Sequence, residues 1–193
     1  MSRPFDWLSG RGHEIAPRLL GCELRCGDRA GRIVEVEAYE GPDDAASHAH
    51  RGPTERSKVM FGRAGLLYVY RSYGIHWCAN VVCGPEGTGS ALLVRAVEPT
   101  AGVDAMWDDR PKARRETDLA SGPGKLCAAL GIDGGHYGVD LLDPTSPVHL
   151  VEGRPAAADE VAVGTRVGIT KAVERPWRFA VAGNPHVSRP RPA

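Results

Sequence analysis

Short apolar segments separated by Gly and Pro run along most of the chain, and their spacing is more often that of strands than of helices. The clearest segment is 31–39, Gly-Arg-Ile-Val-Glu-Val-Glu-Ala-Tyr. Because side chains in a strand alternate between two faces, this pattern places Val34, Val36 and Ala38 on one face and Glu35, Glu37 and Tyr39 on the other. We therefore expect one face to pack and the other to present acids.

Two more strands are expected at 66–70 and 75–83, joined around Ser72-Tyr73-Gly74 as a hairpin with an aromatic ring at its tip. Residues 91–97 are so apolar that both faces should be buried, yet Arg95 lies in their middle. A buried guanidinium needs a carboxylate partner. We therefore expect Arg95 to contact an acid.

Turn and capping signals predict the remaining elements. Helices are expected at 15–20, 103–107 and 121–130, with Gly21 and Gly131 ending the first and the last. Further strands are expected at 22–26, 148–152, 166–170 and 177–181. Segment 41–65 shows little periodicity, and loops of this length are usually functional or disordered.

These elements predict a single α+β domain over residues 1–193. We expect a mixed or antiparallel, strand-rich sheet with flanking helices and a protruding β-hairpin. Residues 187–193 are predicted to form a flexible tail.

Charge does not by itself indicate a nucleic-acid partner. Lys plus Arg and Asp plus Glu both number 24, so the formal net charge is zero. A chain of this kind that binds a polyanion must gather its cations on one face. Two groups could do so: Arg110, Lys112, Arg114 and Arg115, and Arg175, Arg178, Arg189 and Arg191. A solvated surface is the plainer interpretation of both.

Composition and motifs narrow the class of protein. No apolar run is long enough to cross a bilayer, and the first residues lack a secretory signal pattern, so we expect a cytoplasmic protein. Phosphate-loop, dinucleotide, nucleophile-elbow and His-Glu-x-x-His motifs are missing from the sequence, which removes the commonest enzyme classes.

The five cysteines are an odd number, in keeping with a reducing compartment. Cys22 with Cys26 and Cys78 with Cys83 could be read as zinc ligand pairs. Cys78 and Cys83, however, belong to or follow an apolar strand pattern. Buried reduced thiols are the better interpretation, because free Cys behaves as a small hydrophobe.

A series of motifs resembles one known family. They are Glu35-Val-Glu-Ala-Tyr39, Asp44-Ala-Ala-Ser-His48, Met60-Phe61, Leu67-Tyr-Val-Tyr-Arg-Ser-Tyr-Gly74, Asn80-Val-Val, Leu92-Leu-Val-Arg-Ala-Val-Glu-Pro99, Ser121-Gly-Pro-Gly-Lys-Leu126, Arg166-Val-Gly-Ile-Thr-Lys171, Pro176-Trp-Arg-Phe179 and Gly183-Asn-Pro185. They span nearly the whole chain, and in this order they resemble the alkyladenine, or 3-methyladenine, DNA glycosylase family.

The resemblance implies an α+β fold similar to the C-terminal domain of a tRNA formyltransferase. It also implies a monomeric hydrolase, active without metal or cofactor, that flips alkylated purines out of double-stranded DNA and hydrolyses their N-glycosidic bonds in base excision repair. The expected substrates are 3-methyladenine and 7-methylguanine, with hypoxanthine and ethenoadenine as further candidates. Because no lysine nucleophile is evident, the abasic strand should remain intact.

By the same resemblance, Glu37 is the general base for the attacking water and Arg95 helps to hold that water. Glu35 is the less suitable acid, since the family match assigns catalysis to the second one. The plainer interpretations are a solvated strand glutamate for Glu37 and a structural ion pair for Arg95.

The resemblance also assigns residues to base and DNA binding. Tyr39, His48 and Tyr70 would stack on the flipped purine, whose methylated form is a cation that aromatic faces attract. Each of the three could instead have a structural role. His50 competes with His48 for its role, although position after Ala46-Ser47 favours His48.

The same resemblance gives roles to Asn80 and Tyr73, and the helix expected at 121–130 suggests one for Lys125. Asn80 would exclude guanine by crowding its exocyclic amine, or equally be a buried amide satisfied by the backbone. Tyr73 would fill the gap that the flipped nucleotide leaves. Lys125 in the first turns of a helix would contact phosphate, with a plain structural helix about equally favoured.

Two functions of other classes stay open. One is a metal-dependent hydrolase that uses Asp43, Asp44, His48 and His50, which are close in sequence. The other is a noncatalytic nucleic-acid or tRNA binding module, suggested by the implied fold.

Overall fold

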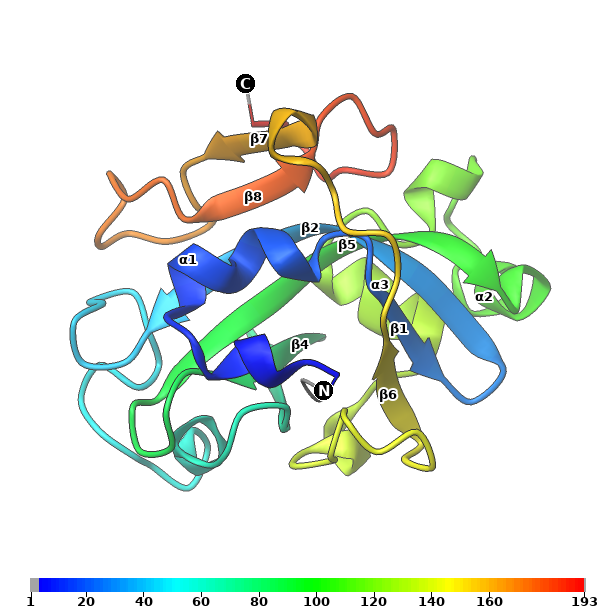
Figure 1. Cartoon of the computed structure of the whole chain (residues 1–193). Helices are drawn as coiled ribbons and strands as arrows, with labels where there is room; N and C mark the ends of the chain where they lie inside the picture. The colour runs from blue at the N-terminus through cyan, green and yellow to red at the C-terminus, as the bar shows by residue number, and fades with distance from the viewer. Residues whose placement is uncertain (1–3, 193) are drawn as a thin grey trace.

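Two long strands, β2 (Arg29–Glu40) and β5 (Ser90–Ala101), pair antiparallel at the centre of the sheet. The computed structural model describes residues 4–192. The sheet has eight strands in the order β3-β4-β5-β2-β1-β6, and β8 pairs with both β2 and β7 (Figure 1). The other strands are β1 (Glu23–Cys26), β3 (Leu67–Ser72), β4 (His76–Cys83), β6 (Val148–Val151), β7 (Val161–Gly164) and β8 (Arg178–Val181). The expected single α+β domain with a strand-rich, antiparallel sheet is confirmed.

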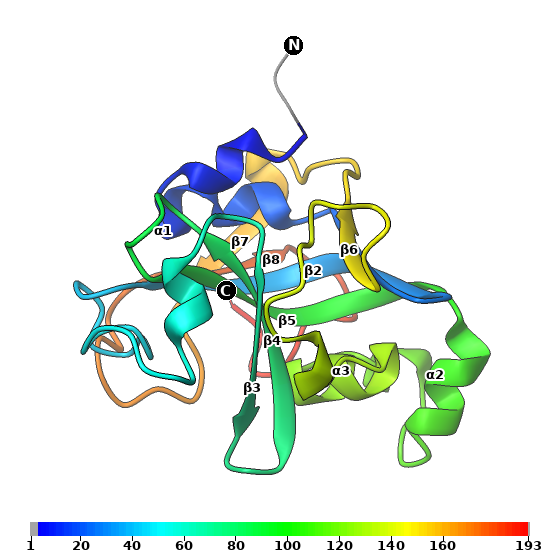
Figure 2. The same cartoon turned by 90° about the horizontal axis from the view of Figure 1, so that it is seen from below.

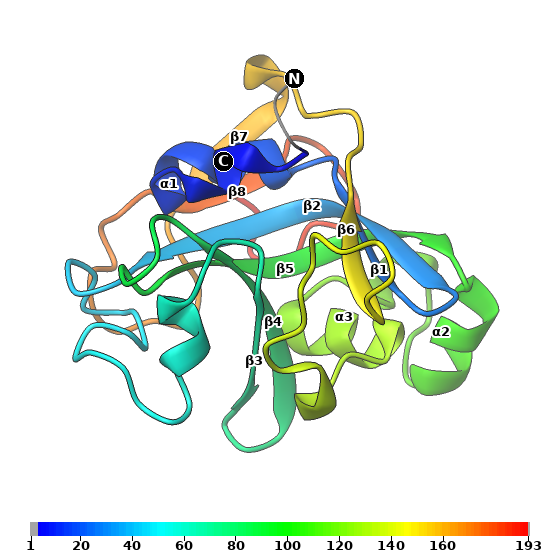
Figure 3. The same cartoon turned by 60° about the horizontal axis from the view of Figure 1, so that its bottom comes forward.

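Three α-helices accompany the sheet within the described residues: α1 (Gly12–Ile15), α2 (Val103–Asp109) and α3 (Pro123–Leu130). Helix α3 lies beside β4 and β5 (Figure 3), and it ends at Gly131, whose φ of 75° is left-handed. Helix α1 continues into a 3-10 turn at Ala16–Leu19. Five more 3-10 turns are Asp6–Ser9, Lys58–Phe61, Glu116–Asp118, Gly134–His136 and Ala158–Glu160.

The prediction of a strand at 166–170 is wrong. Only a non-repetitive segment occupies these residues, and the edge strand is β7, which precedes them. The physical reason is that the Val167 amide donates to the side chain of Glu37, at 2.8 Å, instead of to a neighbouring strand.

The prediction that Val34, Val36 and Ala38 pack together on one face of the strand is also partly wrong. Val36 and Ala38 belong to the main core, but Val34 packs in a separate cluster with Ala96, Ala180 and Val187. The register between β2 and β5 shifts on both sides of Glu35. Such an irregularity interrupts strict alternation along a strand.

The β3–β4 hairpin projects from the body of the domain (Figure 2). At its tip the Ile75 amide donates to Ser72 O at 3.0 Å, and Tyr73 and Gly74 have φ values of 50° and 69°. Two successive positive φ values characterise a type I′ turn, which matches the twist of a hairpin. The Tyr73 side chain is 88% exposed.

The C-terminal segment that follows His186 begins with two buried residues. Val187 and Ser188, the first residues of the predicted flexible tail, are buried, because the Ser188 amide donates to Glu35 Oε2 at 2.7 Å. Residue 193 and residues 1–3 lie outside the described part of the chain, and flexibility beyond Ser188 stays a prediction. Between residues 4 and 192, no helix has the length and apolarity needed to span a membrane.

Candidate active site

Two acids of β2 meet one arginine of β5 at the register shift. Glu35 and Glu37 are fully buried, and Arg95 is 6% exposed. Arg95 Nε donates to Glu35 Oε1 at 2.8 Å, and its Nη1 lies 3.2 Å from Glu37 Oε1. The expected carboxylate partner of Arg95 is therefore a pair of acids, which share its charge.

Glu37 has three polar contacts. Its Oε1 accepts from the Val167 amide at 2.8 Å and pairs with Arg95, while its Oε2 accepts from the Tyr39 hydroxyl at 2.9 Å. Burial raises the pKa of Glu37 above that of an ordinary glutamate, although the charge of Arg95 and the two hydrogen bonds oppose the rise. With a raised pKa, the ionised side chain is a stronger base than that of an exposed glutamate.

Glu35 contacts Arg95, Arg178 and Ser188. Its Oε1 accepts from Arg95, from Arg178 Nε at 2.7 Å and from the Ser188 hydroxyl at 2.9 Å. Its Oε2 accepts from the Ser188 amide. This carboxylate holds the C-terminal segment to β2, and of its partners only Arg95 lines the aromatic cavity described below.

A cavity of about 770 Å³ opens beside these acids. Six of the residues singled out in the sequence line it: Tyr39, His48, Tyr70, Tyr73, Asn80 and Arg95. Glu37 lies behind the wall, in contact with three residues that do line the cavity, namely Tyr39, Arg95 and Val167. The structure thus gathers the predicted pocket residues and the predicted base around one hollow.

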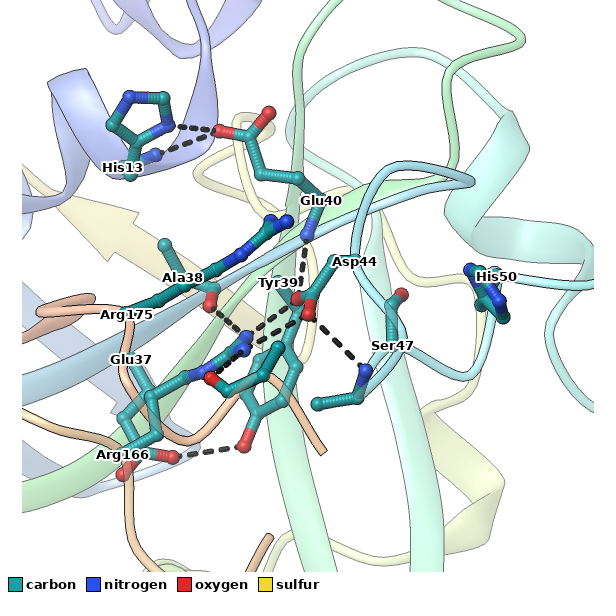
Figure 4. Close-up of polar contacts among 12 residues, drawn as sticks. His13, Glu37, Ala38, Tyr39, Glu40, Asp44, Ser47, His50, Arg166 and Arg175 are labelled. Atoms are coloured by element: carbon teal, nitrogen blue, oxygen red, sulfur yellow. Dashed lines mark hydrogen bonds and ion pairs between the residues drawn. The ribbon is translucent and has the colours of Figure 1, made fainter. Parts of the chain in front are cut away.

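Of the two competing histidines, His48 lines the cavity. Its Nδ1 lies 3.0 Å from the Tyr68 hydroxyl, and its ring meets Tyr70 edge-on with centroids 4.6 Å apart. Burial, with a smaller contribution from Arg56, lowers the pKa of His48, so that the imidazole is neutral at pH 7. His50 lies apart from Asp44 and Arg166 in Figure 4, does not line the cavity, and has its Nδ1 2.7 Å from Pro42 O.

Tyr68 is a lining residue that the sequence analysis did not assign. It stacks on Tyr70 with centroids 5.4 Å apart and lies two residues from it on β3. The i, i+2 spacing that puts both rings on one strand face was the available signal. Asn80 Nδ2 donates to Tyr68 O at 3.0 Å, so this amide is satisfied by the backbone and still lines the cavity.

The charge around the cavity is positive. Four cations line it, namely Arg56, Arg71, Arg95 and Lys171. Among the described residues, no acid lines this cavity. A chain of zero net charge therefore gathers cations at one place, as a polyanion partner requires.

Lys125 lines a second cavity, of about 750 Å³, and not the first one. Arg95 lines both cavities, and the second also contains Arg115, Arg189 and Arg191. Arg178, one of the tail cations considered in the sequence, is buried against Glu35 and cannot reach a partner molecule.

The four residues of the metal-site hypothesis do not come together. Asp44 is buried in an ion pair with Arg166, and His50 turns to Pro42. Within residues 4–192 no group of three or more His, Cys, Asp or Glu is arranged to hold a metal ion. The five cysteines are free thiols, four of them buried and Cys26 partly so.

Two contributors to the site belong to a motif of the family resemblance but were given no role from the sequence. Val167 acts through its backbone amide, which any residue type could supply. Arg166 lay in a segment predicted as a strand, whereas its side chain turns inward to Asp44.

Comparison with known proteins identifies the family. The family model described as methylpurine-DNA glycosylase matches residues 6–185. A protein of Nocardia farcinica is 51% identical, covering 90% of this chain and 84% of its own, and one of Agrobacterium fabrum is 51% identical, covering 96% and 92%. One of Burkholderia lata is 48% identical, covering 92% and 86%. All three bear the name "putative 3-methyladenine DNA glycosylase". With the match running from residue 6 to 185 and the expected residues gathered at one cavity, the chain belongs to the methylpurine-DNA glycosylase family.

Proposed function

We propose that this DNA glycosylase removes alkylated purines from double-stranded DNA by hydrolysing the N-glycosidic bond, with Glu37 as the general base. Family membership makes the chain a DNA repair hydrolase that acts on alkylated DNA. The proposed substrates are 3-methyladenine and 7-methylguanine, with hypoxanthine and ethenoadenine as candidates to be tested alongside them. The proposal also includes action as a monomer in the cytoplasm, to which five unpaired thiols are suited.

The observation that carries the proposal is the position of Glu37 beside Arg95, directly behind an aromatic cavity. A water held by these two groups would lose a proton to the carboxylate as it attacks the anomeric carbon. The C1′–N bond to the purine breaks as the water oxygen bonds to this carbon, and its electron pair leaves with the base. Before the carboxylate takes up the proton, its negative charge would stabilise the oxocarbenium-like sugar. Because the step needs only a base and a water, the proposed product is an intact strand with an abasic site.

The lining of the cavity suits a flipped purine. Tyr39, His48 and Tyr70 line it with aromatic rings, whose faces attract a flat cation such as a methylated purine. Asn80 lies in the same wall and is proposed to exclude guanine through its exocyclic amine. A neutral His48 adds no repulsion to a cationic base.

DNA contacts are proposed for two other places. Tyr73, exposed at the tip of the projecting hairpin beside the cavity, would fill the space that the flipped nucleotide leaves. Lys125 would contact a phosphate in the second cavity, where Arg189 and Arg191 add positive charge.

Release of free base from duplex oligonucleotides tests this function. Substrates with one 7-methylguanine or one hypoxanthine are incubated with the protein, and abasic sites are revealed by alkali. Cleavage only after alkali treatment is expected. Strand cleavage without alkali would contradict the monofunctional mechanism, and absence of base release from every lesion, with tight binding to undamaged nucleic acid, would favour a noncatalytic binding module.

The metal-dependent alternative is tested in the same assay. Excess chelator should leave the rate of base release unchanged, since Asp44 is paired with Arg166 and not with the histidines. Loss of activity that returns with added metal would overturn this part of the proposal.

A further inference from the structure

Arg166 is a buried cation for which the proposed chemistry has no direct use. Its side chain and that of Asp44 are 0% exposed. Burial of a charge is costly unless the charge is paired and hydrogen-bonded. Figure 4 shows the guanidinium directed at Asp44, with the ring of Tyr39 beside it.

One set of contacts holds the turn that carries His48. Arg166 Nη2 donates to Asp44 Oδ1 at 2.8 Å, and Nη1 donates to Asp44 Oδ2. Asp44 in turn accepts from the amides of Ala46 and Glu40 at 3.1 and 3.2 Å. The ion pair therefore fixes the backbone just before His48 against the end of β2.

A second set of contacts holds Tyr39. The Arg166 Cζ lies 4.6 Å from the centre of the Tyr39 ring, and Nη1 donates to Ala38 O at 2.9 Å. Tyr39 lines the cavity and Arg166 does not. The guanidinium thus supports the ring from outside the cavity and leaves its cavity side for a base.

The third connection runs through the chain itself. Val167, the next residue, donates its amide to Glu37 Oε1 at 2.8 Å. Arg166 Nη2 also donates to Ala172 O at 3.4 Å, which closes the loop that contains this amide. Fixing Arg166 therefore fixes the donor that contacts the proposed base.

We propose that Arg166 is a positioning residue, which with Asp44 holds the Tyr39 ring, the His48 turn and the Val167 amide in one arrangement around the cavity. The inference rests on the proposed function for its effect on base release, but its structural part does not. An arginine is needed because the group pairs in a bidentate manner with Asp44 and also contacts two aromatic rings, with its Cζ 4.6 Å from the centre of the Tyr39 ring and 5.2 Å from that of the Trp177 ring. Lysine offers neither geometry.

Hydrogen–deuterium exchange of the free protein tests the structural part. In Arg166→Lys we expect amide exchange to speed up about tenfold or more in segments 41–50 and 166–172, because local opening of these loops becomes easier. Arg178→Lys is the matched control, since this arginine is equally buried but holds Ser188 and Glu35. It should loosen segment 185–190 and leave 41–50 protected.

Kinetics separate positioning from a purely structural role. At saturating lesion DNA, Arg166→Lys should slow single-turnover base release about tenfold or more, with less than about a twofold change in DNA affinity. Because the Val167 hydrogen bond lowers the pKa of Glu37, its loosening should also move the acidic limb of the rate profile to higher pH. A lower rate without these exchange changes, or exchange raised equally over the whole chain, would overturn the inference.

Asp44→Asn provides a second variant should Arg166→Lys fail to fold. It keeps the size of the side chain and the Tyr39 stack but removes the ion pair. The same two segments must lose protection; full protection in both would overturn the inference. Because exchange is measured without DNA, failure of the wild-type protein to release any base would refute the proposed function and leave this result standing.

Discussion

Glu35 and Glu37 lie two residues apart on β2 and contact the same guanidinium, that of Arg95, but only Glu37 also accepts hydrogen bonds from Tyr39 and Val167, two further residues that line the aromatic cavity. Glu35 instead accepts from Arg178 and Ser188. The two acids share the charge of Arg95 but have different hydrogen-bond partners. We therefore regard Glu35 as a structural group and Glu37 as the candidate catalytic group.

Exchanging each acid for its amide should separate these roles. Glu37→Gln should fold, bind lesion DNA and lose base release by about 100-fold or more, because the amide cannot accept the proton of water. Glu35→Gln should lose about 3 kcal/mol or more of the free energy of unfolding, since Arg95 and Arg178 would keep only half of their buried counter-charge. Urea denaturation and single-turnover assays give the two measurements. Equal loss of stability in both variants would contradict the division.

The pH profile of base release should report Glu37. A general base works when ionised, so the rate should fall as pH drops through its raised pKa. Tyr39→Phe removes a hydrogen bond that lowers this pKa and keeps the ring. The acidic limb should therefore move to higher pH. Tyr68→Phe is the control, because the Tyr68 hydroxyl contacts His48 and not Glu37. This variant should leave the acidic limb of the pH profile in place.

Tyr73 should matter for DNA and not for folding. Its φ of 50° is a conformation that Asn adopts at less cost than Tyr. Tyr73→Asn should therefore keep or slightly increase thermal stability while reducing base release from duplex DNA by about tenfold or more, because no ring fills the vacated space. Excision at wild-type rate by this variant would remove Tyr73 from the proposed DNA contacts.

The phosphate role of Lys125 can be read from salt dependence. Lys125→Gln should lower the slope of log affinity against log salt concentration by about one, the expected loss for a single phosphate contact. Lys112→Gln is the control, because Lys112 is exposed and lines neither cavity. Identical slopes for the two variants would argue against a specific contact at Lys125.

Much of the fold follows from local sequence pattern. Alternation predicted β2 and a continuous apolar run predicted β5. Glycine predicted the end of α3 at Gly131, and two apolar runs with turn residues between them predicted the hairpin around Tyr73. The buried strand around Arg95 also predicted an acid as its partner, because an unpaired guanidinium is too costly in a core. These are consequences of short-range geometry and desolvation.

Local pattern misled where long-range contacts replaced backbone pairing. The apolar alternation of 166–170 favoured a strand, but the Val167 amide is satisfied by Glu37 and Arg166 by Asp44, both far away in sequence. Val34 left the expected face because the register with β5 shifts beside Glu35. A remote side-chain acceptor and a register shift both change the structure of a segment, but neither can be recognised from the sequence pattern of that segment.

The sequence alone determined the family, the central acids and the aromatic residues of the pocket, since those depend on residue type and order. Only the tertiary structure showed that Glu37 and not Glu35 contacts Tyr39 and Val167, that His48 and not His50 lines the cavity, and that Arg166 contacts Tyr39. The reason is that a side chain's role here depends on which donors and rings surround it, and those come from β2, β3, β5 and two loops that meet only when the sheet has formed.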